Sequence, residues 1–138
     1  MAYGMIGAIG ECTLANSNYS FVHGNPCALM TLGNVVMLCD DVHITGSYTS
    51  GNTIMTLPDS AMFPDHDILV PIVTTRGTTN YARYMKVKTD GTISVLHGTS
   101  DFDIHFDGIL FHVNNKYYTP AIGNIYDNGS SPLTVGRY

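Results

Sequence analysis

Turn signals recur along this chain at intervals of about 8–12 residues, and this spacing restricts its fold more than any other feature. Pairs such as Ser50-Gly51, Asp90-Gly91 and Asp107-Gly108 separate short runs in which apolar and polar residues alternate. No run has the apolar period of a long amphipathic helix. The sequence therefore predicts an all-β protein, a small antiparallel β-sandwich or barrel built of short hairpins.

The composition supports one globular domain with an unusually uncharged surface. Of 138 residues, only 12% are charged while 44% are apolar, and the chain has 9 Tyr and no Trp. So many apolar residues exclude a disordered chain. Ser, Thr, Asn and Tyr must therefore cover the surface, which is more typical of virion or extracellular proteins than of cytosolic enzymes.

Charge and cysteine content restrict the partners and the compartment. The formal net charge is −5 and the six basic residues are scattered, so nucleic-acid binding is not expected. No stretch approaches the ~20 apolar residues of a membrane span, and no signal peptide is expected, so the prediction includes no membrane insertion. Cys12, Cys27 and Cys39 lack a metal-ligand spacing, which indicates reduced, buried thiols and folding in a reducing cytoplasm.

The stretch DFDIHFDGILFHV, residues 101–113, predicts a hairpin with a two-residue turn at Asp107-Gly108. In that register Ile104 lies opposite Phe111 on an apolar face. The other face brings Asp103 opposite His112, with His105 nearby, because alternate residues of a strand share a face.

Two further hairpins follow from the same reasoning. In residues 85–95, a three-residue loop with Gly91 in the left-handed conformation best separates apolar from polar residues on the two faces. It brings Val87 opposite Ile93. Residues 42–57 form a second predicted hairpin around Ser50-Gly51, with its apolar side on Ile44, Tyr48, Met55 and Leu57.

Residues 28–39, with a two-residue turn at Gly33-Asn34, predict a hairpin that is apolar on both faces. A half-exposed sheet would not need a second apolar face, so that face is expected to be covered by another subunit or by the N-terminal segment. The subunit is favoured, and the predicted interface residues are Leu29, Thr31, Val36 and Leu38. Residues 1–27 are interpreted as an N-terminal arm for attachment, and residues 28–138 as the head domain.

Residues 34–97 resemble a known family through a series of strand ends and turns. The series runs through Thr56-Leu57-Pro58, Pro64, Ile68 to Pro71, Asn80 to Arg83, and Asp90 to Val95. It is similar to the C-terminal head or shoulder domains of phage baseplate and tail-fibre (receptor-binding) proteins, over about half of the chain. The resemblance implies a small β-sandwich or barrel in a homotrimer, displayed on a virion and in contact with host surface glycans.

The leading functional hypothesis is therefore a phage virion adsorption protein, folded in the host cytoplasm, that binds host cell-surface carbohydrate. Its expected partners are copies of itself, other virion proteins through the arm, and the host glycan. The alternative is a structural virion protein, such as a capsid decoration or fibre-joining protein, that binds other virion subunits. A bacterial accessory domain for polysaccharide processing is a third reading.

Carbohydrate binding needs aromatic rings beside hydrogen-bonding groups. Two pairs of tyrosines meet this need. Tyr81 and Tyr84 lie beside the Arg83 guanidinium, and Tyr117 and Tyr118 lie beside Asn114 and Asn115. Because side chains alternate along a strand, only one tyrosine of each pair can face a given surface. The polar face of residues 101–113 is the third candidate. Together, the candidate glycan-binding residues are Tyr81, Arg83, Tyr84, Asp103, His105, His112, Tyr117 and Tyr118.

Metal binding and catalysis have weaker support. Asp103, His105 and His112 form a reasonable ligand set for zinc, but the same residues are ordinary on a solvent-facing strand, which is the preferred interpretation. The loop Asp65-His66-Asp67 lacks the ligands and glycine of a calcium loop. Glu11 is the only glutamate and no nucleophile elbow occurs. We therefore expect no metal, no cofactor and no enzymatic activity.

Overall fold

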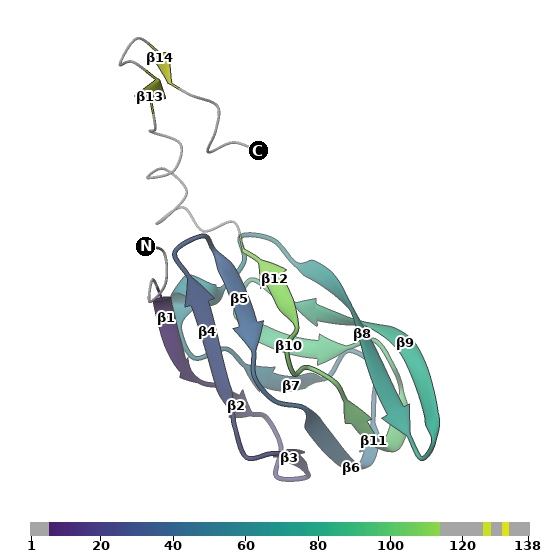
Figure 1. Ribbon diagram of the computed structural model, residues 1–138. Helices are drawn as coiled ribbons and strands as arrows, with labels where there is room; N and C mark the ends of the chain where they lie inside the picture. The colour runs from purple at the N-terminus through teal and green to yellow at the C-terminus, as the bar shows by residue number, and fades with distance from the viewer. Residues whose placement is uncertain (1–5, 114–125, 128–130, 133–138) are drawn as a thin grey trace.

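The computed structural model describes residues 6–113, 126–127 and 131–132. Within them the chain is all-β, as predicted, with an eight-stranded antiparallel sheet that forms a nearly closed barrel and a separate four-stranded antiparallel sheet (Figure 1). The helical content of these residues is one 3₁₀ turn, η1 (Ser60–Met62). The described part of the chain contains no helix with the length and hydropathy to cross a membrane.

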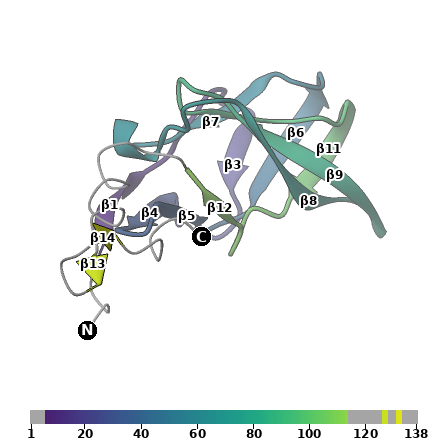
Figure 2. The same ribbon diagram turned by 90° about the horizontal axis from the view of Figure 1, so that it is seen from above.

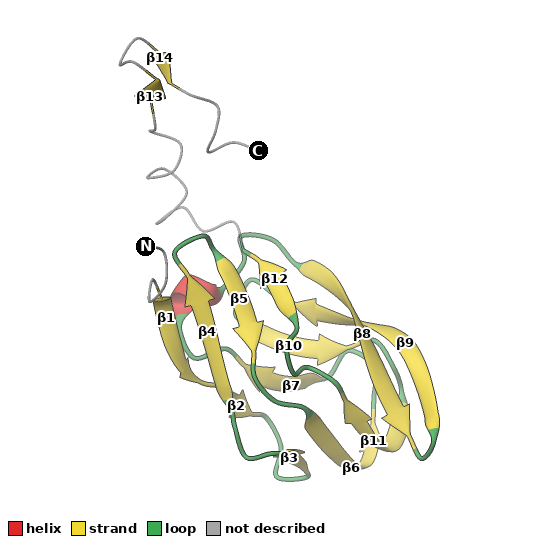
Figure 3. Cartoon of the chain, in the orientation of Figure 1, coloured by secondary structure: helices red, strands yellow, loops and turns green. Residues whose placement is uncertain are grey.

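Each sheet collects strands from distant parts of the sequence (Figure 3). The four-stranded sheet has the order β1 (Ile6–Glu11), β4 (Cys27–Thr31), β5 (Val35–Leu38), β12 (Leu110–His112). The barrel sheet has the order β2 (Thr13–Leu14), β7 (Thr53–Thr56), β10 (Thr92–Val95), β9 (Thr79–Val87), β8 (Ile68–Arg76), β11 (Thr99–Ile104), β6 (Val42–Tyr48), β3 (Tyr19–Phe21). A small pair, β13 (Tyr126–Asp127) and β14 (Ser131–Pro132), follows.

Residues 15–18 join the two ends of the barrel sheet. The Ala15 amide donates to the Ile54 carbonyl beside β2 at 2.9 Å, and the Thr45 amide donates to the Asn18 carbonyl beside β3 at 2.9 Å. The short connection thus bridges the gap that would otherwise separate β7 from β6. The described part of the expected N-terminal arm therefore contributes strands to both sheets, and an attachment role for this segment stays a prediction.

One apolar core lies between the two layers (Figure 2). The inner face of the four-stranded sheet contributes Ala28, Met30, Val36, Leu38 and Phe111. The barrel contributes buried side chains from its long strands, among them Phe102, Ile104, Met85 and Ile93. Burial of this continuous cluster supplies most of the driving force for folding.

The hairpin of residues 85–95 is confirmed in register and loop. Val87 pairs with Ile93 and Met85 pairs with Val95. Gly91 has a φ of 82°, the left-handed conformation that the three-residue loop requires. The sequence pattern was decisive here because one face of each strand is apolar and the other is polar.

The hairpin predicted for residues 101–113 is wrong, although its turn exists. The Ile109 amide donates to the Phe106 carbonyl at 3.0 Å, and Gly108 has a φ of 76°. Beyond the turn the chain changes layer, because Gly108 donates to the Leu38 carbonyl and Leu38 donates to the Ile109 carbonyl. As a result β12 pairs with β5, whereas β11 pairs with β6 and β8 in the barrel.

The hairpin predicted for residues 42–57 is also wrong in its pairing. A turn forms, with the Asn52 amide donating to the Thr49 carbonyl at 3.0 Å. However, β6 pairs with β3 and β11, and β7 pairs with β2 and β10. The expected apolar side is buried as predicted, at Ile44, Tyr48, Met55 and Leu57.

The hairpin of residues 28–39 exists, but its register differs from the prediction by one residue. Asn34 adopts a φ of 65° in a three-residue loop, so Met30 pairs with Val36. Val36 and Leu38 consequently lie in the core, exposed by 0% and 1%, whereas Leu29 and Thr31 lie on the outer face. Val36 and Leu38 therefore cannot belong to a subunit interface in this register.

The outer face of the four-stranded sheet is nevertheless apolar. Its middle row consists of four directly paired residues, one from each strand: Ile9, Leu29, Met37 and Leu110. Ile9 and Leu110 at the two edges are 60% and 56% exposed. We call these four residues the outer apolar row.

Candidate functional site

Polar side chains lie directly opposite one another across five neighbouring strands on the outer face of the barrel. In strand order they are Asn80, Thr75, Asp103, His43 and Ser20. His43 Nδ1 lies 2.7 Å from Asp103 Oδ1. The row exists because residues in register on antiparallel strands share a face, although they are distant in the sequence.

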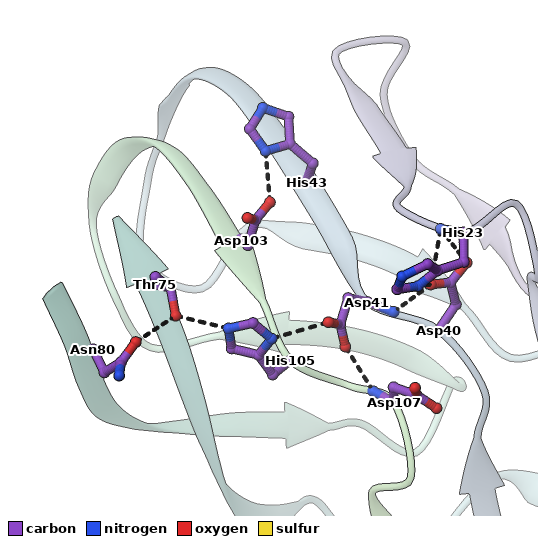
Figure 4. A network of polar contacts seen from close by, with 9 residues as sticks. All are labelled: His23, Asp40, Asp41, His43, Thr75, Asn80, Asp103, His105 and Asp107. Atoms are coloured by element: carbon purple, nitrogen blue, oxygen red, sulfur yellow. Dashed lines mark hydrogen bonds and ion pairs between the residues drawn. The ribbon is translucent and has the colours of Figure 1, made fainter. Parts of the chain in front are cut away.

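A chain of hydrogen bonds runs beside this row (Figure 4). His105 Nδ1 lies 2.9 Å from Asp41 Oδ2, and His105 Nε2 lies 2.7 Å from Thr75 Oγ1. The Thr75 hydroxyl donates to Asn80 Oδ1 at 2.7 Å, and the Asp107 amide donates to Asp41 Oδ1 at 3.0 Å. This chain links β8, β9 and the segments that flank β6 and β11.

The donor and acceptor roles of the two His105 ring nitrogens follow from its tautomer, and both nitrogens have a partner, the Thr75 hydroxyl and the Asp41 carboxylate. The groups satisfy one another, so the network orients the barrel face and offers few free contacts to a ligand.

The Asp40 carboxylate holds the segment between β3 and β4 in place, and its side chain is fully buried, with 0% exposure. It accepts hydrogen bonds from the backbone amides of His23, Asn25 and Asp41, and His23 Nδ1 lies 2.9 Å from its Oδ1. Burial raises the pKa of Asp40, but these hydrogen bonds, led by that of Asn25, outweigh burial and hold the pKa below its ordinary value. We interpret this site as structural.

A third cluster of polar side chains uses fewer of its hydrogen-bonding groups than the two described above. Tyr81, Arg83 and His97, which we call the Arg83 cluster, are all half-buried. The Arg83 guanidinium lies 5.0 Å from the centre of the Tyr81 ring, and the Tyr81 and His97 rings are 5.1 Å apart. Such contacts hold a guanidinium in a defined orientation.

The strand register explains how the Arg83 cluster forms. Alternation along β9 puts Tyr81 and Arg83 on one side and Tyr84 on the other. The Leu96 amide donates to the Tyr84 carbonyl at 2.9 Å, which keeps the segment after β10 beside β9 and brings His97 to Tyr81. His97 Nδ1 lies 3.0 Å from the buried Thr74 hydroxyl, and its other nitrogen, Nε2, has no hydrogen-bond partner among the described residues.

A chain of ring contacts runs from the Arg83 cluster into the core, where Phe102 and Tyr48 are buried. The ring centres of His97 and Phe102 are 5.6 Å apart, those of Phe102 and Tyr48 are 5.8 Å apart, and those of Tyr48 and Tyr19 are 6.3 Å apart. The Tyr48 hydroxyl accepts from the Val95 amide at 3.1 Å, and burial raises the pKa of Tyr48 to about 12. The Arg83 cluster therefore packs against buried, hydrogen-bonded side chains of the core.

Among the described residues no carboxylate forms an ion pair with Arg83, and Arg83 Nη1 donates to the Ala82 carbonyl at 2.9 Å. Burial first, and then the Arg83 charge, lower the pKa of His97 below its ordinary value. At neutral pH the cluster thus presents one cation, a neutral imidazole and a phenol, with donors to spare.

The structure separates the candidate residues chosen from the sequence. Tyr81 and Arg83 meet, while Tyr84 lies 52% exposed on the opposite face. Asp103 and His105 share the outer face of the barrel, with His43 and Asp41 as partners. His112 lies on the other sheet, opposite Val35. Tyr117 and Tyr118 lie outside the described residues.

The predicted neighbours Asp103 and His112 do not meet, so the zinc ligand set discussed above is not assembled. No group of three or more His, Cys, Asp or Glu side chains in residues 6–113, 126–127 and 131–132 is arranged to hold a metal ion. The sequence analysis chose none of His97, Thr75 and Asp41 as a site residue. Thr75 and Asp41 reach His105 through strand pairing over long sequence separations. For the Arg83 cluster the local signals were the alternation of Tyr81 and Arg83 and the register of β9 with β10, which brings His97 to the same face.

No family of known proteins, no curated protein and no solved structure matches this chain.

Proposed function

We propose that this chain is a phage virion adsorption protein that binds host cell-surface carbohydrate through the Arg83 cluster, without an enzymatic step. The observation that carries the proposal is the Arg83 guanidinium, which forms no ion pair within the described part of the chain and is held on the Tyr81 ring beside a neutral His97. Sugar recognition uses planar guanidinium donors and aromatic surface together. The phage resemblance of residues 34–97 supports the virion location.

The chemistry of the Arg83 cluster favours a sugar with an acceptor-rich edge. Arg83 has five N–H donors in a fixed fork, which fit two neighbouring hydroxyls or one carboxylate. His97 Nε2 and the Tyr81 hydroxyl add one contact each. A single site of this size binds weakly, but linked copies raise the overall avidity by roughly 10²–10⁴.

Replacement of Arg83 by glutamine should weaken glycan binding by about 10-fold to 100-fold, the effect of removing a charge-assisted hydrogen bond. The measurement is glycan-array binding of the multivalent protein, followed by calorimetry on the best ligand. Arg76→Gln is the matched control, because Arg76 lies on the same β8–β9 hairpin and contacts Ser100. Tyr84→Ala tests the opposite face of β9 and should leave binding unchanged.

Two results would count against this assignment. Absence of binding to any glycan by the multivalent protein would reject carbohydrate adsorption altogether. Equal losses in Arg83→Gln and Arg76→Gln would retain a glycan ligand but reject the Arg83 cluster as its site.

We further propose that adsorption proceeds from a homotrimer in which the outer apolar row is covered. Leu110→Asp should convert the trimer to monomers, because a buried carboxylate in an apolar contact costs several kcal/mol. Native mass spectrometry measures the change. Leu69→Asp is the control, since Leu69 is equally exposed, 56%, but lies on the barrel. A wild-type protein that is monomeric at all concentrations would contradict the proposal.

The second candidate function is a structural virion protein whose ligand is another virion subunit. The outer apolar row favours it, because that row suits a protein neighbour as well as a copy of the same chain. Locating the chain in intact particles separates the two functions. A position at the distal tip of the tail supports adsorption, and a position on the head shell supports decoration.

A further inference from the structure

Three cysteines that are far apart in the sequence approach one another at one end of the four-stranded sheet. The Cys39 amide donates to the Cys27 carbonyl at 3.2 Å, and the Cys12 amide donates to the Pro26 carbonyl at 2.8 Å. All three cysteines are free thiols. The expectation that all three are buried holds only for Cys12.

Strand alternation separates the three thiols into two groups. The register that pairs Ala28 with Leu38 brings Cys27 opposite Cys39, and both are half-buried on the outer face. Cys12 lies opposite Pro26, one position along from the pair of Glu11 and Cys27, so it faces the interior and is 6% exposed. Cys27 and Cys39 are thus neighbours on one face, and Cys12 lies on the other.

We propose that Cys27 and Cys39 form a disulfide when the folded protein meets an oxidising thiol–disulfide couple, and that Cys12 remains a free thiol. Directly opposite residues of antiparallel strands have Cα atoms about 4.5–5.5 Å apart, within the range of about 4.4–6.8 Å found across disulfides. No change of strand register is needed. The bond closes the β4–β5 hairpin at the end away from its loop, and it does not depend on the function proposed above.

With oxidised glutathione as the oxidant, the reaction has two exchange steps. The Cys27 thiolate attacks the glutathione disulfide, which expels one glutathione thiolate and leaves a mixed disulfide. The Cys39 thiolate then attacks the Cys27 sulfur and expels the second glutathione thiolate. Two protein thiols are oxidised, one glutathione disulfide is reduced, and the two protons of the cysteines pass to the two glutathione thiolates.

The environment of Cys39 affects how fast the disulfide forms and not whether it forms. Burial, followed by the hydrogen bond to Cys27, raises the pKa of Cys39 to about 11, so its thiolate is scarce at neutral pH. Burial likewise raises the pKa of Cys12 to about 12. Closure of the disulfide is therefore expected to be faster at pH 9 than at pH 7.

The test is to incubate the folded, reduced protein with oxidised glutathione at pH 9 and count thiols after denaturation. The count should fall from three to one, and peptide mapping without reductant should link Cys27 to Cys39. Cys12→Ser should retain this link and Cys39→Ala should abolish it. The oxidised protein should show a Tm higher by roughly 5–10 °C, reversed by a reductant.

The wild-type peptide map alone decides the question, so the test does not depend on whether a variant folds. Three thiols that persist after incubation would overturn the proposal. So would a link that includes Cys12, or a product in which glutathione stays attached to Cys27.

Discussion

Replacement of Asp40 by alanine is expected to lower the free energy of unfolding by about 4 kcal/mol, because it leaves buried donors without an acceptor. The carboxylate accepts from the amides of His23, Asn25 and Asp41, and its side chain is fully buried. Without it, the segment between β3 and β4 loses its attachment to the start of β6. Urea denaturation of the variant and the wild type measures the loss.

Asp65→Ala is the matched control for Asp40. Asp65 also pairs with a histidine, His66, at 2.6 Å, but both side chains are exposed. An exposed pair of this kind contributes about 0–1 kcal/mol. Similar losses in the two variants would show that burial and the backbone amides do not matter, and would contradict the assignment of Asp40 as a structural anchor.

The pair of His23 and Asp40 also fixes a pH window. Asp40 has a folded-state pKa below its unfolded value of 3.8, so its contribution is complete above that value and is lost as the pH falls through the folded-state pKa. Hydrogen bonding to Asp40 raises the pKa of the exposed His23 above 6.5. The His23 contribution is complete below 6.5 and is lost as the pH rises through the raised value. Both contributions are therefore present between pH 3.8 and 6.5.

Replacement of Phe102 by alanine should also cost about 4 kcal/mol, the usual effect of removing a buried phenylalanine ring. Phe102 is 1% exposed and contacts both Tyr48 and His97. Because His97 rests on this ring, the variant is expected to weaken glycan binding as well as stability. Thermal unfolding and calorimetry with the best glycan measure the two effects.

Phe102→Leu separates the two effects of Phe102. Leucine refills much of the volume, so stability should fall by only about 1–1.5 kcal/mol, but it removes the aromatic contact to His97. Leu69→Ala, at an exposed apolar position, should change stability by less than about 0.5 kcal/mol. An unaffected glycan affinity in Phe102→Ala would contradict the role of the aromatic chain as a support for the Arg83 cluster.

The local features of this fold were predictable from the sequence, whereas the strand partners were not. Gly91 and Gly108 adopt left-handed conformations in the turns that their sequences predict. A turn, however, is fixed by a few residues, and it does not determine whether the strands on either side pair. After Asp107-Gly108 the apolar residues Ile109 and Phe111 fit a continued hairpin and a crossing to β5 equally well. The alternation of apolar and polar residues therefore did not distinguish the two arrangements.

The same limit explains the register of β4 and β5. A slip of one residue exchanges the two faces of a strand, and here both faces are apolar, so hydrophobicity did not penalise the slip. The loop decided the register through Asn34, which takes the left-handed conformation in place of a glycine. Within the candidate site, alternation along β9 correctly joined Tyr81 to Arg83. The register predicted for β9 and β10 also brings His97 to the same face as Arg83, although His97 was not chosen as a site residue.

The crossing of the chain from β11 to β12 determines when this protein can fold during synthesis. Strand β5 ends at Leu38, but its partner β12 begins at Leu110, so about 70 residues must be translated between them. At about 5–20 residues per second this takes roughly 4–14 s. During that interval the free edge of β5 in the β4–β5 hairpin has no strand to pair with. This apolar edge is then most accessible to other nascent chains on the same polysome.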